Sequence, residues 1–451
     1  MTASTQYSRL ALAVVVALAS VVGFAPTTAG AAQARERRTD ITIRTNSEFD
    51  AAHGVRSGTG TPEDPYVISG WELNNITIKD TSAAVLIADN TVNSRLTLDW
   101  VGRNADVHSN RVNDLRVNQN VKRTGDPTSG VIAHNTFNVV GQLRHFDGVF
   151  EHNTVGTPKE GTNRLLGEVL TNRAVNFDGF NGAHFRDNTI YGYVEVRLHG
   201  HHHSSGFGED SHHHGGMGDD MDHATRYHEV WVTGNTITVP PGTFAALQYV
   251  DNNHAGNDRT ATSEENPALN DPHVHYTRVH ITDNKLVGSG LRADIFNADD
   301  QRHIRTERGR LDLDNNTIVL EQATNPFSAP AGIRVSDATD VDVYIRNNNI
   351  AGPHQHTAVD EFIHGGAGID LSYIDKANVR LYDNTIAHTH YGIYGYSFTN
   401  SVRWFVGGLT TEDVHEPVYA SNVANQAEPR PAEEETGEDG GSDGGGHHEH
   451  P

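Results

Sequence analysis

The stretch Val343-Tyr344-Ile345-Arg346-Asn347-Asn348-Asn349-Ile350 contains the pattern that decides the fold. Apolar residues alternate with other residues up to Ile345, and an apolar residue returns two positions after Asn348. Alternation at period two is typical of a β-strand with one buried face, and Asn is a common turn residue. The pattern therefore predicts a short strand, a turn at the Asn and a second strand.

The same pattern recurs along the chain in one phase. The residue three places before the Asn and the residue two places after it are apolar in every copy. The closest copies are 18 residues apart, from Asn135 to Asn153, which leaves no room for a helix. A repeat this short is the signature of a solenoid. The repeated residues are Asn90, Asn110, Asn135, Asn153, Asn188, Asn235, Asn284, Asn316, Asn348 and Asn384.

We therefore predict an all-β chain that forms a single-stranded, right-handed parallel β-helix, with about ten or more coils and long loop insertions. Successive coils would lie about 4.8 Å apart. An Asn at the same corner of every coil could donate to one neighbour and accept from the next. We expect this hydrogen-bonded ladder, although each Asn could also act only as a turn former.

The ends of a solenoid need coils that stop the repeat. At the start, Trp71 stands where the Asn is expected, between Ile68 and Leu73. At the end, Val402, Trp404 and Leu409 fit the apolar places of an eleventh rung, with Gly407 at the place of the Asn. We expect these two coils to cap the ladder.

Three segments of different composition follow one another in the 451 residues. Residues 1–34 are predicted to be a secretory signal peptide, because the uncharged run Leu10–Phe24 is followed by small residues. Residues 41–422 are the predicted β-helix, and residues 423–451 an acidic, His-containing disordered tail. No second apolar run follows, so we expect a secreted, extracellular or cell-surface protein without membrane insertion after cleavage.

The charge balance excludes some partners. The net charge is −24, there is no Cys, and Lys supplies only 5 of the 34 basic residues. An acid-rich, Lys-poor surface fits a halophilic, high-salt habitat, where salt screens the self-repulsion. This balance argues against nucleic acid and anionic membranes as partners. A polyanionic substrate would need a local basic groove.

The longest spacings require insertions. Polar segments at His199–His228, Asp251–His275 and Asn297–Gly309 follow predicted strands at the same place in three consecutive coils, so they should leave from one edge. A second edge would carry His354, His356 and His364 in one coil, and His388 and His390 in the next.

Histidine is unusually frequent, with 29 residues, and nine of them lie in the insertion 199–228. Neutral imidazole suits zinc and copper, and thioether suits reduced copper. The sequence therefore predicts a transition-metal site, for copper or zinc, unless the insertion is only a solubilising loop. The predicted ligands are His199, His201, His202, His203, His212, His213, His214, Met217, Met221, His223, His273 and His275.

The segment Ser57-Gly58-Thr59-Gly60-Thr61-Pro62-Glu63-Asp64-Pro65-Tyr66-Val67-Ile68 resembles the opening of secreted right-handed β-helix proteins of the archaeal type, often grouped with NosD. The Gly-Ile pairs at Gly332, Gly368 and Gly392 look like that family's second strand. NosD proteins assist the assembly of a copper enzyme. The resemblance implies the β-helix fold, and it leaves the function open because this scaffold serves many roles.

Two other functions stay open. Asp271-Pro272-His273 resembles the catalytic Asp-Pro-His of mannuronan epimerases, which belong to the broad pectate-lyase-like β-helix group, but residues 268–270 lack that family's aromatic lead-in. That resemblance would make Asp271 and His273 the acid/base pair of a uronate-polymer lyase or epimerase. A cell-surface adhesion or structural module, which binds cell-envelope polysaccharide or nothing, is the third alternative.

Overall fold

A computed structural model of the chain describes residues 35–99, 101, 105–118, 130–146, 148–158, 173–179, 182–198, 226–241, 243–252, 275–296, 309–321, 331–338, 341–353, 366–399, 401–423 and 428–429. The chain divides into the units Met1–Glu36 and Arg37–Pro451. The second unit contains the repeats. Within the described ranges, no helix is both long and apolar enough to span a bilayer.

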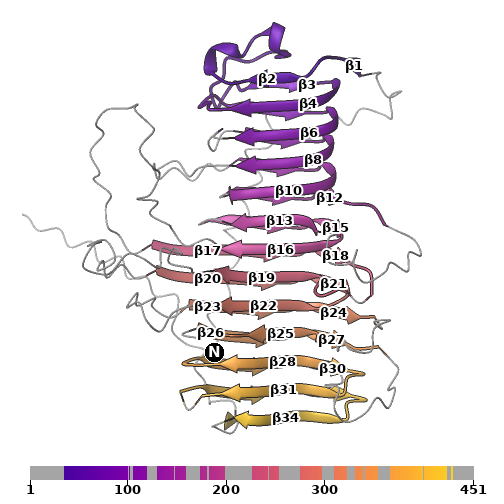
Figure 1. Ribbon diagram of the computed structural model, residues 1–451, viewed down its shortest axis with the longest axis vertical. Coiled ribbons are helices and arrows are strands. Elements are labelled where there is room, and N and C mark those ends of the chain that lie inside the picture. Colours follow the sequence, from indigo (N-terminus) through magenta and orange to yellow (C-terminus); the bar gives the residue numbers. More distant parts are fainter. Residues whose placement is uncertain are drawn as a thin grey trace, which may run out of the picture. The chain divides into compact units, whose positions relative to one another are not determined.

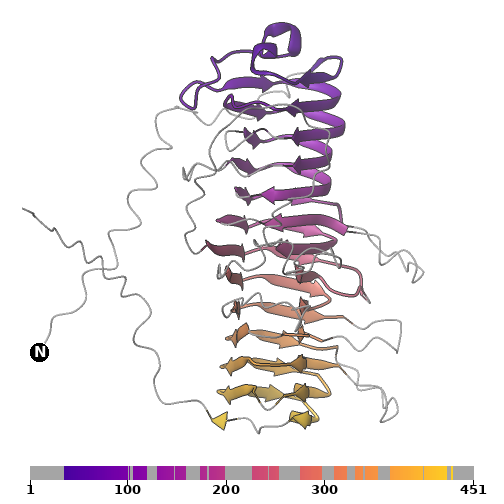
Figure 2. The ribbon, with the colours of Figure 1, turned by 60° about the vertical axis from the view of Figure 1, so that its left-hand side comes forward.

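The repeat unit winds into a parallel β-helix, which confirms the predicted fold class (Figure 1). Among the described residues, the ladders from β2 onward are parallel, and Figure 2 shows the strands stacked in chain order. Two 3-10 helices, η1 (Asn46–Glu48) and η2 (Ala51–His53), precede the coils.

The smaller sheet, here sheet B, carries the strand that leads into each Asn turn. Its strands among the described residues are β3 (Tyr66–Ser69), β5 (Val85–Ala88), β7 (Ala105–His108), β9 (Val131–Ala133), β11 (Val149–Glu151), β14 (Ala183–Arg186), β17 (Arg226–Thr233), β20 (His275–Thr282), β23 (Gly309–Asp314), β26 (Val341–Arg346), β29 (Asn378–Tyr382), β32 (Arg403–Gly407) and β35 (Glu428–Pro429).

The larger sheet, sheet A, carries the chain after each Asn. In the first coils a single long strand follows each Asn, and its pairing with the next coil shifts in register near the start of the strand. These early strands are β1 (Glu36–Arg37), β2 (Ile41–Ile43), β4 (Trp71–Lys79), β6 (Thr91–Asp99), β8 (Arg111–Asn118) and β10 (Thr136–Phe146).

From β10 onward each coil has two sheet A strands, because β10 pairs with β12 through Thr136 and with β13 from Val140. The short strands are β12 (Thr154–Val155), β15 (Thr189–Tyr191), β18 (Thr236–Thr238), β21 (Lys285–Gly288), β24 (Thr317–Leu320), β27 (Asn349–Ala351), β30 (Thr385–Ala387) and β33 (Thr410–Glu412). The long strands are β13 (Arg173–Gly179), β16 (Tyr193–Leu198), β19 (Leu247–Asn252), β22 (Leu291–Phe296), β25 (Ile333–Ser336), β28 (Ala367–Ile374), β31 (Tyr391–Phe398) and β34 (Glu416–Val423).

The predicted Asn ladder is present and buried. All ten Asn are between 0% and 2% exposed. The Oδ1 atom of Asn284 accepts from both the backbone N and the Nδ2 of Asn235, at 3.0 Å each. The Nδ2 of Asn284 donates to Asn316 Oδ1 at 3.1 Å and to the Val232 carbonyl at 2.9 Å. Each amide thus links three coils.

A second feature of the turn is the residue before each Asn, which adopts a left-handed backbone. Asp89, His134 and Asn347 have φ values of 56°, 57° and 56°, and Gly234 has 68°. Asp, Asn, His and Gly tolerate this region better than other residues do. The turn therefore combines a left-handed residue with the amide that satisfies the neighbouring coil.

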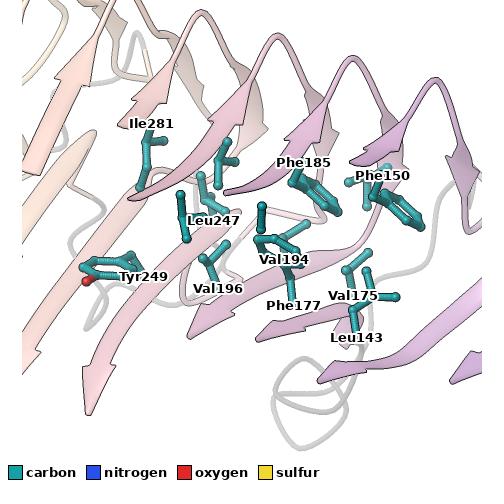
Figure 3. Close-up of a cluster of buried hydrophobic side chains, with 14 of the residues drawn as sticks. Leu143, Phe150, Val175, Phe177, Phe185, Val194, Val196, Leu247, Tyr249 and Ile281 are labelled. Carbon is teal, nitrogen blue, oxygen red and sulfur yellow. The ribbon is translucent and has the colours of Figure 1, made fainter. Parts of the chain in front are cut away.

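Stacked apolar side chains fill the interior. The residues three before and two after each ladder Asn are all buried, as predicted. Phe150 and Phe185 lie face to face, with ring centroids 5.1 Å apart, and Phe177 packs against Phe185 at 5.3 Å (Figure 3). Because the coils are in register, similar side chains lie above one another. Each coil therefore packs its inward side chains on those of the neighbouring coils.

The first coil replaces the ladder Asn with an aromatic residue, as predicted. The backbone N of Trp71 donates to Asn90 Oδ1 at 3.0 Å, so the first Asn keeps its acceptor role. The indole Nε1 donates to the Gly54 carbonyl, and the Arg56 guanidinium lies 3.4 Å from the ring centroid. These contacts connect the first coil to the segment that precedes it.

The predicted register of the last coil is wrong by two residues. Leu381 pairs with Val406, so Val406 and not Trp404 takes the place three before the Asn. Leu409 therefore stands at the Asn position, and Gly408, with φ of 63°, takes the left-handed place. The alternation of Val402, Trp404 and Val406 fits either offset, and without an Asn nothing in the pattern sets the phase.

Two glycines show why the Gly-Ile pairs recur. A Cβ on Gly332 would lie 2.4 Å from Ile350 Cγ2, and one on Gly368 would lie 2.4 Å from Ile386 Cγ2. Both Ile are the buried residues two places after a ladder Asn. Glycine therefore lets the start of the long strand pass close to the short strand of the next coil.

The ladder makes a prediction about stability. Asn284→Ala removes four hydrogen bonds of the buried ladder, among them the acceptor of the Asn235 backbone N, so it should lower the free energy of unfolding by about 1–3 kcal/mol. Chemical denaturation of wild type and variant measures this. The control is Asn138→Ala, which removes an exposed Asn–Asn hydrogen bond of 2.7 Å and should change stability by less than about 0.5 kcal/mol. Equal losses in both variants would contradict the structural role of the ladder.

Candidate functional site

The strands that precede the three insertions end side by side. Leu198, the last residue of β16, pairs with Asp251 of β19, and Asp251 pairs with Ile295 of β22. Parallel neighbours lie about 4.8 Å apart. The segments that follow these strands therefore start from one edge of sheet A, as the sequence predicted.

The strands that follow the first two insertions also start side by side. Arg226 opens β17 and pairs with His275, which opens β20. The roots of both insertions are thus in register at both ends. Of the predicted metal ligands, only His275 lies within the described residues. Those outside them are His199, His201, His202, His203, His212, His213, His214, Met217, Met221, His223 and His273, together with the alternative catalytic residue Asp271.

The described residues by themselves hold no preformed metal centre. Nowhere in the ranges given above do three or more His, Asp or Glu side chains stand close enough to share an ion. At the second predicted edge, His388 Nδ1 lies 3.2 Å from Asp413 Oδ2, and His390 stacks on His415 with centroids 4.7 Å apart. The other predicted residues of that edge, His354, His356 and His364, are outside the described ranges.

A row of stacked rings lies on the outer face of sheet B, on β14 and on the strands β17 and β20 that follow the first two insertions. His184 of β14, Trp231 of β17 and His280 of β20 occupy the same register position. The His184 and Trp231 rings are 4.4 Å apart and nearly parallel, and His280 lies 5.7 Å from Trp231 on the other side. One imidazole thus covers each face of the indole, and this separation prevents the two from binding one ion.

Carboxylates surround His280. Its Nε2 lies 2.7 Å from Glu229 Oε1, and its Nδ1 lies 3.4 Å from Asp312 Oδ2. The Asp312 side chain is only 2% exposed and is also bound by Arg310 at 3.0 Å and Arg346 at 3.2 Å. This arrangement compensates a buried carboxylate with several cations, as buried charge requires.

Burial dominates the surroundings of His184. Burial lowers the pKa of His184, and Arg186 on the same strand lowers it further. Glu229 on β17 and Glu151 on β11 oppose this shift but do not cancel it. The ring is therefore neutral at neutral pH and stacks on Trp231 without charge.

The outer face of sheet A, beside the insertion roots, carries nearly buried carboxylates. Asp294 accepts from Arg292 Nε at 2.7 Å, from Gln248 Nε2 at 2.7 Å and from Ser336 Oγ at 2.7 Å. Glu195 is bound by Arg197. Arginine therefore compensates the charge of both nearly buried carboxylates.

Sequence reasoning missed both of these networks, although a signal for part of them exists. Arg292 and Asp294, like Arg310 and Asp312, are two residues apart on a strand and therefore point to the same face. An Arg-x-Asp or Glu-x-Arg spacing within a predicted strand could have indicated an ion pair. The ring row has no such local signal, because His184 and Trp231 are 47 positions apart.

The shifted His184 makes a prediction about pH. Because its pKa is lowered in the folded chain, the unfolded chain binds more protons below its reference pKa of about 6.5. The stabilising contribution of neutral His184 is thus complete above that pH and declines as the pH falls toward the lowered value. His184→Phe keeps a ring against Trp231 and removes the titration, so its unfolding free energy should fall less than that of wild type between about pH 6.5 and 5. Denaturant titrations across this range test it, and parallel curves would refute it.

No family model, curated protein or solved structure matches the chain. The fold therefore rests on the strand register and the Asn ladder.

Proposed function

We propose that this chain is an exported β-helix protein that binds a transition-metal ion, copper or zinc, through its His-rich insertions, without catalysis. The observation that carries the proposal is the shared edge: Leu198, Asp251 and Ile295 pair in sequence across three neighbouring strands. Segments that are separated along the chain thus start within about 10 Å of one another.

The return strands support the same conclusion. The segment 199–225 enters β17 at Arg226, and the segment 253–274 enters β20 at His275, and these two residues are register partners. His273 is two residues before that point and His275 is at it. Ligands from the second insertion can therefore meet the eight His of residues 199–225 without any change in the coils.

The chemistry of these residues suits a borderline or soft cation. Imidazole binds zinc and copper, with metal–nitrogen distances of about 2.0–2.1 Å for zinc. Met217 and Met221 add thioether, which favours reduced copper. Because several ligands come from polar segments, the ion itself would supply the free energy that orders the site.

Export and a copper-related role complete the proposal. The signal-peptide pattern of residues 1–34 implies secretion, and the low Lys content fits a halophilic surface. The stretch Ser57–Ile68 resembles proteins that assist copper-enzyme assembly, and Met217 and Met221 supply the chemical preference for reduced copper. We therefore infer a secreted or surface-attached metal scavenger or delivery protein.

Metal titration tests the proposal. Calorimetry of the full chain, purified without a tag or nickel column, should show copper or zinc binding tighter than about 100 μM at pH 7.5. Binding should be weak at about pH 5, because protonation of His competes with the metal below a pKa of about 6.5. No binding of either ion at pH 7.5 would reduce the His segment to a solubilising loop.

The chain offers a matched control for the site. Replacing residues 199–214 with a Gly/Ser segment should remove most of the bound metal and leave the coils folded, because no ladder residue lies there. Replacing residues 255–270, a segment of equal length without His, should leave metal binding unchanged. Equal loss in both variants would show that the insertions act through folding rather than through ligands.

The enzyme alternative has its own discriminating experiment. Among the described residues, carboxylates on the outer face of sheet A such as Glu195 and Asp294 are bound by arginine, which does not favour acid/base work. We expect no cleavage or epimerisation of polyuronates by the wild type. Activity that disappears in Asp271→Asn, with metal binding intact, would replace the metal proposal with a lyase or epimerase.

A further inference from the structure

Five tyrosines gather on the outer face of sheet A in the last coils, far along the chain from the insertions. We call this group the tyrosine face. Its members come from β28, β31 and β34, and they are Tyr373, Tyr391, Tyr394, Tyr396 and Tyr419. These three strands lie next to one another (Figure 1).

Three of the rings pack on one another. Tyr394 and Tyr419 are register partners and stack with centroids 5.4 Å apart and planes within 6°. Tyr391 contacts both, at 5.3 Å and 5.1 Å. Aromatic cross-strand pairs of this kind stabilise a sheet and account for these three residues.

Stacked cross-strand ring pairs do not account for the other two tyrosines, Tyr396 and Tyr373. The register partners of Tyr396 are Ser372 and Ser421, so among the described residues no ring of a neighbouring coil lies above or below it in its column. Its nearly parallel neighbour is Tyr394 of the same strand, with ring centroids 6.4 Å apart. Tyr373 meets Tyr396 edge to face at 5.5 Å and is 56% exposed, with φ of 58°. The five rings form a contiguous aromatic patch that is open to solvent at Tyr373, and contiguous patches of this kind mark interaction surfaces.

Two carboxylates lie beside the rings: Asp370, which is compensated, and Glu416, the register partner of Tyr391. Asp370, the register partner of Tyr394, is bound by Arg334 at 2.7 Å and by Ser372 Oγ at 2.7 Å. Burial, with Asp370 next, raises the pKa of Tyr394 to about 12, so its phenol stays a neutral donor. The face therefore offers aromatic rings and hydroxyl groups in a chain whose net charge is −24.

This combination selects one class of ligand. A hexopyranose has a face of C–H groups, which packs on an aromatic ring, and a rim of hydroxyls, which exchanges hydrogen bonds with phenol and serine. A polyuronate meets long-range repulsion from the chain and finds no uncompensated cation in this group of residues. An apolar protein partner would leave the hydroxyls unsatisfied.

We propose that the tyrosine face binds a neutral polysaccharide, with one pyranose ring against Tyr396 and neighbouring units near Tyr373 and Tyr419. This site is independent of the proposed metal site, because its strands contain none of the predicted ligands. It would hold the protein on a glycan while the insertions stay available to the metal.

Calorimetry and affinity electrophoresis of the full chain test this, with a soluble β-glucan, a mannan and a xylan as neutral probes and polygalacturonate as the anionic one. At least one neutral probe should bind, and polygalacturonate should not. Tyr396→Ala should weaken binding by about tenfold or more, since a central aromatic contact carries much of the affinity. Tyr396→Phe keeps the ring and should stay within about threefold of wild type.

The control is Tyr191→Ala, a half-buried tyrosine on β15, which should bind as wild type does. Thermal melting of each variant separates lost binding from lost folding. The proposal is overturned if the wild type binds none of the neutral probes, if it prefers polygalacturonate, or if Tyr396→Ala binds normally. A concentration-dependent dimer that Tyr396→Ala abolishes would also overturn it and assign the face to a second copy of the chain.

Discussion

A row of ten buried amides is the constraint on which the rest of this molecule depends. A buried amide without partners is costly, so every coil has to bring an Asn to the same corner, within hydrogen-bond distance of the next. The distances in the row stay between 2.8 and 3.2 Å, whatever the sequence separation of the residues. A shift of one residue in any strand would break two rungs and turn buried side chains outward. The ladder therefore sets the phase of both sheets.

That phase also determines which side chains lie next to one another on the outer faces of the two sheets. Because each strand position lies above its equivalent in the next coil, outward residues form rows along the sheets. The row through Trp231 becomes a ring stack, and the row through Tyr394 becomes an aromatic pair. The strand ends at Leu198 and Asp251 bring two insertions to one edge. A candidate site in this fold is thus a set of neighbours in register, and its residues are far apart in the sequence.

Much of the frame could be predicted from the sequence because it is periodic. The inward position of Ile281 and the turn at Asn284 follow from spacing within eight residues, and Trp71 was recognised as a substitute at the first turn. The left-handed residue before each Asn was missed, although Asp, Asn, Ser, His and Gly at that place are a readable signal. The last coil was placed two residues off because no Asn marks its phase. The contact of Glu229 with His280 could not be predicted, since it depends on which coils are neighbours after a long insertion.

The constant hydrogen-bond distance along the ladder affects how the sequence of such a chain can change in evolution. The ladder distance is the same whether 18 or 49 residues separate two Asn. Closing a longer loop costs only about 0.6 kcal/mol for each doubling of its length. Segments between coils can therefore be lengthened, shortened or exchanged almost without effect on the frame. New binding properties could be acquired by exchanging loops alone. For the same reason, the edge at Leu198 and Asp251 is a suitable place to graft foreign peptides.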